Sequence, residues 1–315
     1  MPPPSFLNPL FSGAVRCVAS CSKYFASGGD DEVVNVFDAK RLVERGSLFG
    51  HKGTVNALSF SSSSDILLSG GADGSVLLWK TKEWERVAAL QGHTSEVSTV
   101  ACHPTGAVAV SGSRDCTLRL WDLSTLKCIN KTSFERAAHG AGGLGMSGRY
   151  DGLERVRWGG GDGSCYAIAR ASVCQLFEAT SDKPVATFTH SQTVTDCDFT
   201  SAGLVVTGCN DGCVRLWDRR QVRQITRHYC DVNWFSRLEQ ASAAVMELPP
   251  HAVRVKCVAA RGSTVVSAGS DGDLRVTELT AATSGGGVST GAGLRIVAQA
   301  ATGARITSCA IAAAP

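Results

Sequence analysis

Residues 50–80 read GHKGTVNALSFSSSSDILLSGGADGSVLLWK, and residues 92–122 read GHTSEVSTVACHPTGAVAVSGSRDCTLRLWD. The two stretches align without a gap, and in each a histidine near the start precedes a tryptophan near the end by 28 residues. A third histidine and tryptophan, 27 residues apart, lie further along the chain. The three pairs are His51–Trp79, His93–Trp121 and His190–Trp217. Self-similarity of this kind indicates a chain built from repeated units that stack on one another.

Two polar positions between the histidine and the tryptophan are repeated as well. An aspartate lies six residues before each tryptophan, and a serine or threonine lies four residues before the aspartate. These positions hold Ser69 and Asp73, Ser111 and Asp115, and Thr207 and Asp211. Two weaker copies, at Asp31 and Asp271, keep the serine and the aspartate. Successive aspartates are therefore 42, 42, 96 (two units of 48) and 60 residues apart.

The runs that follow the aspartates predict strands. SVLLW at 75–79, TLRLWD at 117–122 and CVRLWD at 213–218 alternate with a period of two but stay largely apolar, which is typical of strands buried between stacked sheets. The turns ADGS and NDGC place glycine directly after aspartate, where a positive φ is easily adopted. The 34 glycines among 315 residues, with only 19% charged residues, favour many short strands joined by tight turns.

A period of 40–45 residues with GH and WD punctuation resembles the WD-repeat β-propeller family, in which four strands form each blade. We therefore expect an all-β fold, with one propeller domain over residues 1–315 and seven blades, the last of them incomplete. Six repeats can be counted, at 11–48, 49–90, 91–133, 134–188, 189–229 and 230–280. Residues 281–315, which contain LRIVAQA and ARITSCAIAA, are expected to form the partial closing blade.

The resemblance also implies a role for the repeated polar residues. In the family, the histidine, the serine or threonine, the aspartate and the tryptophan of one blade form a hydrogen-bonded chain, here called a tetrad. The tetrad ties an inter-blade loop to the sheet and gives each buried polar atom a partner, which avoids a penalty of about 1–3 kcal/mol for an unpaired group. The expected structural tetrads are His51–Ser69–Asp73–Trp79, His93–Ser111–Asp115–Trp121 and His190–Thr207–Asp211–Trp217.

Composition excludes several classes of protein. The net charge is only +3, which does not suit a globally basic nucleic-acid binder. No apolar stretch reaches the roughly 18 residues of a membrane helix, and the start, MPPPSFLNPLF, lacks the basic and apolar regions of a secretory signal. The 13 cysteines are odd in number and scattered through apolar segments, so we expect reduced thiols in an intracellular protein without a membrane partner.

No catalytic group is predicted. His51, His93, His190 and His251 occupy the same position of different repeats, so they lie on different blades and cannot converge on a metal ion or a nucleophile. Two pairs of cysteines with three residues between them lack a second pair at a spacing suited to zinc. We therefore expect a protein that is not an enzyme, with no cofactor, no metal site and no small-molecule substrate.

Basic residues are the candidates for binding a partner. Four arginines lie within nine residues after the third tryptophan of the repeats, and guanidinium groups bind carboxylate or phosphate through paired, charge-assisted hydrogen bonds. These are Arg219, Arg220, Arg223 and Arg227. Two further pairs are expected at opposite ends of the disc, Lys52 and Arg114 beside the tetrads and Lys80 and Lys82 at the other end.

One segment resembles a narrower family. It holds a basic tract after Asp38, the sequence K-x-W-E from Lys82 to Glu85, and HP-x-G at His103. These features resemble the PAK-kinase-interacting WD-repeat proteins, which are related to the yeast maintenance-of-killer factor. The resemblance is clearest over residues 27–130.

This narrower resemblance implies a nucleolar assembly factor for the large (60S) ribosomal subunit, located in the nucleolus and nucleus. Its partners would be pre-60S assembly factors or ribosomal proteins, with contact to rRNA, and it would also regulate PAK-type kinases. An alternative stays open. Residues 205–220 resemble the WD-x-Arg box of substrate receptors for cullin-RING ubiquitin ligases, a role in which Arg220 would contact the ligase.

Overall fold

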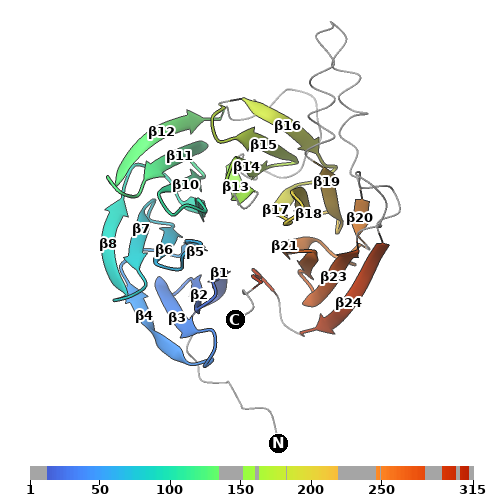
Figure 1. Ribbon diagram of the computed structural model, residues 1–315, viewed down its shortest axis with the longest axis horizontal. Coiled ribbons are helices and arrows are strands. Elements are labelled where there is room, and N and C mark those ends of the chain that lie inside the picture. Colours follow the sequence, from blue (N-terminus) through green and yellow to red (C-terminus); the bar gives the residue numbers. More distant parts are fainter. Residues whose placement is uncertain are drawn as a thin grey trace, which may run out of the picture.

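The computed structural model describes residues 13–134, 152–159, 163–181, 183–218, 246–248, 250–280, 293–302 and 306–311. Over these ranges, 24 strands form six antiparallel sheets of four strands each, arranged as blades around a ring (Figure 1). Among the described residues, no helix has the length and the hydropathy that a membrane crossing requires.

Each blade runs from an inner strand near the centre of the ring to an outer strand at its rim (Figure 1). The first blade holds β1 (Val15–Ser20), β2 (Tyr24–Gly29), β3 (Val33–Asp38) and β4 (Glu44–Phe49). The second holds β5 (Val55–Phe60), β6 (Ile66–Gly71), β7 (Val76–Lys80) and β8 (Glu85–Leu90). The third holds β9 (Val97–Cys102), β10 (Val108–Ser113), β11 (Thr117–Asp122) and β12 (Lys127–Ser133).

The other three blades follow in the same order. The fourth holds β13 (Leu153–Gly159), β14 (Cys165–Arg170), β15 (Val173–Glu178) and β16 (Pro184–Thr189). The fifth holds β17 (Val194–Phe199), β18 (Leu204–Cys209), β19 (Val214–Asp218) and β20 (Met246–Leu248). The sixth holds β21 (Val255–Arg261), β22 (Thr264–Gly269), β23 (Asp273–Thr280) and β24 (Gly293–Ala301).

The outer strands of the fifth and sixth blades come from further along the chain than the repeats predict. β20 pairs with β19, so residues 246–248 belong to the fifth blade and not to the repeat expected at 230–280. β24 pairs with β23, so LRIVAQA completes the sixth blade instead of starting a closing blade. Both strands follow long stretches of sequence, 219–245 and 281–292, and the regular period therefore no longer marks where these blades end.

Five apolar cores hold the six blades together, one at each interface between neighbours from the first blade to the sixth. Leucine and valine side chains from two adjacent sheets are present in every core, and buried cysteines add to two of them. At the interface of the second and third blades, for example, Leu68 and Leu78 share a core with Val97 and Val100. The largely apolar strands of the repeats are therefore buried on both faces, as their sequences predict.

Glycines in the second strands allow the next blade to approach closely. A Cβ atom added at Gly28 or at Gly70 would lie 2.6 Å from a Cγ1 atom of Val55 or Val97, which belong to the following blade. At Gly208 the corresponding distance, to Val255, is 2.8 Å. Non-bonded carbon atoms do not approach this closely. The valine can occupy its position only because the residue opposite it is glycine, which has no Cβ atom.

Polar side chains in the inner strands add a second link between neighbouring blades. The amide of Asn56 donates to the carbonyl oxygen of Val97 at 3.3 Å, and the hydroxyl of Thr195 donates to that of Val255 at 2.9 Å. Ser98 makes the equivalent bond to the fourth blade. These residues lie at register shifts in β5, β9 and β17, where an extra residue turns its side chain toward the next blade.

Residues 306–311 lie between the inner strands of the first and sixth blades (Figure 1). The hydroxyl of Thr307 donates to the carbonyl oxygen of Val15 at 2.5 Å, and that of Ser308 accepts from β1 at 3.4 Å. On the other side, Arg261 donates to a carbonyl oxygen of the segment at 3.4 Å. The six blades agree with the six counted repeats, but the incomplete seventh blade is not confirmed, because this part of the described chain pairs into no sheet.

The substitution Gly70→Ala tests the close approach of the blades. The added methyl group would have to displace Val97, and overpacking of this kind lowers the free energy of unfolding by about 1–3 kcal/mol. Urea denaturation of the purified chain measures the change.

Two control variants test whether the loss of stability in Gly70→Ala comes from the clash of the added methyl group with Val97. Ala169, which has the same place in the fourth blade, is already alanine, so Ala169→Gly should cost no more than about 1 kcal/mol. Adding Val97→Ala to Gly70→Ala should recover part of the loss. Equal stability of Gly70→Ala and the parent chain would contradict the model of tight blade packing.

Candidate functional site

The tetrads of the second and third blades form continuous hydrogen-bonded chains. In the second blade, Nδ1 of His51 lies 3.1 Å from the carboxylate of Asp73 and Nε2 lies 2.8 Å from the hydroxyl of Ser69. The indole N–H of Trp79 donates to the same hydroxyl at 2.9 Å. The corresponding distances in the third blade, for His93, Asp115, Ser111 and Trp121, are 3.0, 2.7 and 2.8 Å.

The tetrad of the fifth blade is interrupted between its histidine and its aspartate. Nε2 of His190 bonds to Thr207 at 2.8 Å, and Trp217 donates to Thr207 at 2.8 Å. However, Nδ1 of His190 is buried without a hydrogen-bond partner. The carboxylate of Asp211 instead pairs with Arg215 at 2.8 Å. Ion pairing in the same blade therefore removes the aspartate from the predicted chain.

Burial keeps the tetrad histidines neutral. Desolvation lowers the pKa of His51 and His93, although the neighbouring aspartates act in the opposite direction. The pKa of His190 falls to about 4, because desolvation is reinforced by the positive charge of Arg215. The side chains of His51 and His93 are 1% and 0% exposed, so no substrate reaches them. These imidazoles are fixed polar links between loop and sheet.

The basic candidates are divided between the two ends of the disc. Lys52 follows His51 and is exposed, with its backbone N–H donating to Asp73. Arg114, at the same end, pairs with Glu96 at 3.3 Å. Lys80 and Lys82 are exposed at the end of β7 and in the turn after it, at the opposite end.

The cluster of four arginines lies outside the described residues. This applies to Arg219, Arg220, Arg223 and Arg227. The other four basic candidates do not form a single patch, because Lys52 and Arg114 lie at one end of the disc and Lys80 and Lys82 at the other.

Trp84, one of the residues that carry the narrower resemblance, has a structural role. It lies in the turn between β7 and β8 with a φ of 55°. Its ring meets that of Tyr24 edge to face, with the centroids 5.0 Å apart. This contact joins the first blade to the second, and the side chain is therefore not free to bind a partner on its own.

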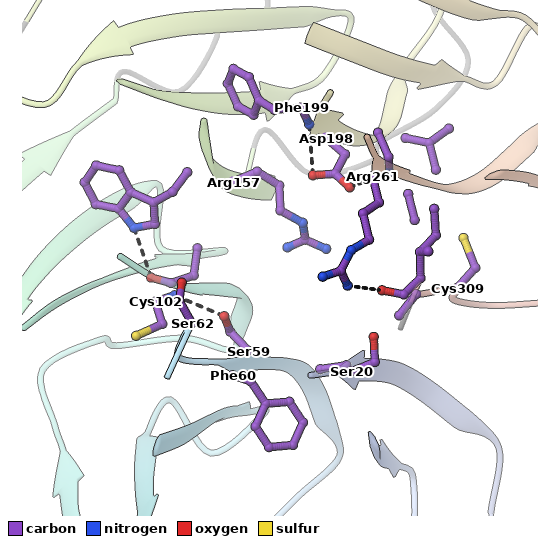
Figure 2. A pocket seen from close by; sticks show the side chains of 18 of the residues that line it. Ser20, Ser59, Phe60, Ser62, Cys102, Arg157, Asp198, Phe199, Arg261 and Cys309 are labelled. Carbon is purple, nitrogen blue, oxygen red and sulfur yellow. Dashed lines mark hydrogen bonds between the residues drawn. The ribbon is translucent and has the colours of Figure 1, made fainter. Parts of the chain in front are cut away.

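The sequence interpretation missed a cavity at the end of the ring opposite the tetrads. Its volume is about 700 Å³, and its walls come from the last residues of all six inner strands and from residues 309–311. Figure 2 shows Ser20 and Ser59 on one side and Asp198 on the other, with the side chains of Arg157 and Arg261 extending between them.

Charged residues of the fourth and fifth inner strands lie near the centre of the ring, and two of them, Arg157 and Asp198, line this cavity. Arg155 pairs with Asp196 at 3.2 Å, and their side chains are only 14% and 3% exposed. Asp198, two residues further, accepts from the backbone N–H groups of Phe199 at 2.9 Å and Ala260 at 2.7 Å. Burial raises the pKa of Asp198 to about 6, against the opposing effect of the nearby Arg157.

A sequence signal for these residues exists. Arg155 and Arg157 are two positions apart in LERVRWG, and Asp196 and Asp198 are two positions apart in VTDCDF. Residues with this spacing share one face of a strand. The equivalent faces of the other inner strands carry mostly small or apolar residues. The two charged pairs therefore stand out in the sequence, and they could have been predicted to line the central channel of the ring.

Comparison with known proteins agrees with the repeated four-stranded blades. The family model described as WD domain, G-beta repeat, matches residues 8–38, 43–80, 84–122 and 182–218. The chain is a WD-repeat protein. Propellers of this family typically act as scaffolds for other proteins. The four matched repeats correspond to the first, second, third and fifth blades, in which the sequence pattern is most regular.

Two curated relatives of this WD-repeat protein match short stretches. The p21-activated protein kinase-interacting protein 1 of Mus musculus is 39% identical over 59 residues, which are 19% of this chain and 15% of the relative. Protein MAK11 of Saccharomyces cerevisiae is 34% identical over 58 residues, which are 18% of this chain and 14% of the relative. The match therefore spans less than a fifth of the length of either relative.

Two solved structures resemble nearly the whole WD-repeat protein. The structure of U3-55K gives a TM-score of 0.74 at 13% identity and covers 96% of this chain and 86% of that chain. The RRP9 WD40 repeats give a TM-score of 0.73 at 14% identity, with 96% and 85% covered. At this level of identity the similarity establishes the propeller fold.

Double-mutant cycles should distinguish the intact tetrad from the interrupted one. In the third blade, removing His93 and Asp115 singly and together should give a coupling of about 1 kcal/mol or more, because each residue is the hydrogen-bond partner of the other. In the fifth blade, the cycle for His190 and Asp211 should give a coupling near zero. Chemical denaturation measures both, and equal couplings would contradict the difference between the two blades.

The stability of the WD-repeat protein should fall as the pH falls from 6.5 toward 4. In this window the unfolded chain binds a proton at His190 and the folded chain does not, so the free energy of unfolding decreases. Thermal melts of the parent chain and of a His190→Gln variant isolate this contribution, which should be absent from the variant. Histidine NMR should give His190 a titration midpoint near 4, and a midpoint near 6.5 would contradict the burial argument.

Proposed function

We propose that this WD-repeat protein is a non-catalytic scaffold that docks other proteins during assembly of the large ribosomal subunit in the nucleolus. The observation that carries the proposal is the sequence match to MAK11 and to the p21-activated protein kinase-interacting proteins. The sequence features of residues 27–130, which form most of the first three blades, support the same assignment.

The geometry supports docking as the mode of action. The tetrad histidines and aspartates are committed to holding loops against sheets, and they leave a rigid disc with two ends and a rim. Rigid scaffolds that position surface loops are well suited to binding several partners. Pre-60S assembly factors or ribosomal proteins are the partners that we propose, with exposed lysines providing contact to rRNA.

The vertebrate relatives suggest a second partner. Their names state an interaction with a p21-activated protein kinase. We therefore propose a kinase of this type as a further partner, whose activity the scaffold would reduce.

We also propose that residues 306–311 form the inner strand of an incomplete seventh blade. The bonds from Thr307 and Ser308 to β1, and from Arg261 to the segment, support this interpretation. The position of the segment between the first and sixth blades is the position that a seventh inner strand would occupy.

Sedimentation of a tagged chain from nucleolar extract tests the assembly function. We expect the chain to migrate with precursors of the large subunit, and mass spectrometry of the recovered particles should identify assembly factors or ribosomal proteins. Charge reversal at Lys80 and Lys82, with Lys52→Glu as the control at the other end, should show which end of the disc is used.

The ubiquitin-ligase alternative predicts a different result. In that case a cullin adaptor would be recovered with the tagged chain, and Arg220→Glu would abolish the recovery. A diffuse cytoplasmic signal together with absence from the subunit precursors would contradict the assembly function.

A further inference from the structure

The cavity opposite the tetrads contains an arginine without a carboxylate partner. On β13, Arg155 pairs with Asp196, whereas the guanidinium of Arg157 donates to the carbonyl oxygen of its own neighbour, Val156, at 3.2 Å. No described carboxylate oxygen lies within ion-pair distance of Arg157, and its side chain extends into the cavity (Figure 2). A guanidinium has five N–H donors, so most of the hydrogen-bonding capacity of Arg157 is available to a ligand.

A second guanidinium faces the same space. Arg261, at the end of β21, donates to the carbonyl oxygen of Ile311 at 3.4 Å, and its side chain turns toward that of Arg157 (Figure 2). Two like charges that share a partly enclosed cavity repel each other more strongly than they would in bulk water. An anion placed between them would relieve this repulsion and accept hydrogen bonds from both.

The acidic residue of the cavity compensates only part of this charge. Both carboxylate oxygens of Asp198 already accept backbone N–H groups, one from Phe199 and one from Ala260. With two guanidinium groups and one carboxylate, the cavity keeps a net charge of about +1 at neutral pH. That charge matches a monoanionic carboxylate better than a dianionic phosphate.

The wall of the cavity supplies neutral donors as well. The hydroxyl of Ser59 accepts the N–H of Cys102 at 3.0 Å, and its own hydrogen is left to donate to a ligand. The hydroxyl of Ser20 lies on the same side (Figure 2). A cavity of about 700 Å³ has the size of a site for a small ligand or a peptide end, and it is too small for a folded domain.

We propose that this end of the channel binds the carboxylate of an acidic peptide segment of a partner protein, held between Arg157 and Arg261. The proposal deepens the docking function and rests on it only in taking the partner to be a protein. It does not depend on whether that partner belongs to ribosome assembly. The guanidinium groups of Arg157 and Arg261 both donate hydrogen bonds to the carboxylate, and the hydroxyls of Ser20 and Ser59 bind the neighbouring peptide groups.

NMR titration of the full chain with the peptide acetyl-Gly-Gly-Glu-amide tests the proposal. The Nε–Hε signals of Arg157 and Arg261 should shift and saturate, whereas acetyl-Gly-Gly-Gln-amide should cause no saturable shift. Arg157→Gln should weaken binding about tenfold or more, and the exposed Arg261→Gln should weaken it several-fold, because each variant removes a charge-assisted hydrogen bond.

A matched control lies at the other end of the channel. Arg16 is also an arginine of an inner strand, but it is paired with Asp30 at 2.7 Å, and Arg16→Gln should leave binding unchanged. Equal responses to the two peptides, or normal binding by both Arg157→Gln and Arg261→Gln, would overturn the proposal. Tighter binding of inorganic phosphate than of the Glu peptide would also overturn it, and would assign the cavity to phosphate. Sedimentation with subunit precursors is independent of all these outcomes.

The pH dependence provides a second test. Between pH 7 and pH 5 Asp198 gains a proton, since its pKa is about 6. The glutamate of the probe stays mostly ionised in this range. The charged or titratable groups near Asp198 are Arg157 of β13, Asp196 of its own strand, Arg261 of β21, and Cys309, whose thiol stays neutral because its pKa is raised. Affinity should therefore rise several-fold toward pH 5 in the parent and stay flat in Asp198→Asn, and a fall in the parent would contradict the site.

Discussion

The close approach of a valine to a glycine of the preceding blade is the constraint that sets the packing of the first blade on the second, the second on the third and the fifth on the sixth. Between Gly70 and Val97, or Gly28 and Val55, there is room for a hydrogen atom and not for a methyl group. A sheet can therefore stack on its neighbour in only one position along the strands. At these interfaces the contact limits how one inner strand can lie against the next, and with it which residues line the centre of the ring.

That fixed register explains how scaffolding and binding are divided in this molecule. The tetrads link loops to sheets at one end of the disc. Their histidines are hydrogen-bonded within the blades and are therefore structural residues. At the other end, the inner strands of the fourth and fifth blades bring charged residues to positions where the other blades carry mostly small or apolar ones. The candidate binding site thus lies where the repeat departs from its own pattern.

The sequence predicted the elements that repeat and missed those that depend on individual side chains. Three copies of one pattern were enough to predict the strands of most blades, because burial on both faces gives these strands a recognisable composition. β20 and β24 could not be placed, since long stretches separate them from their blades. The broken link at His190 was also not predictable, because it depends on competition between Arg215 and the histidine for Asp211.

The contact between the first and sixth blades differs in kind from the other five. Each of those five is filled by an apolar core, whereas here a single stretch, residues 306–311, is inserted and makes polar bonds on both sides. Because a few hydrogen bonds replace an apolar core there, we expect this interface to open more easily than the other five. The ring could therefore open at this one interface and close again while every blade keeps its four-stranded sheet.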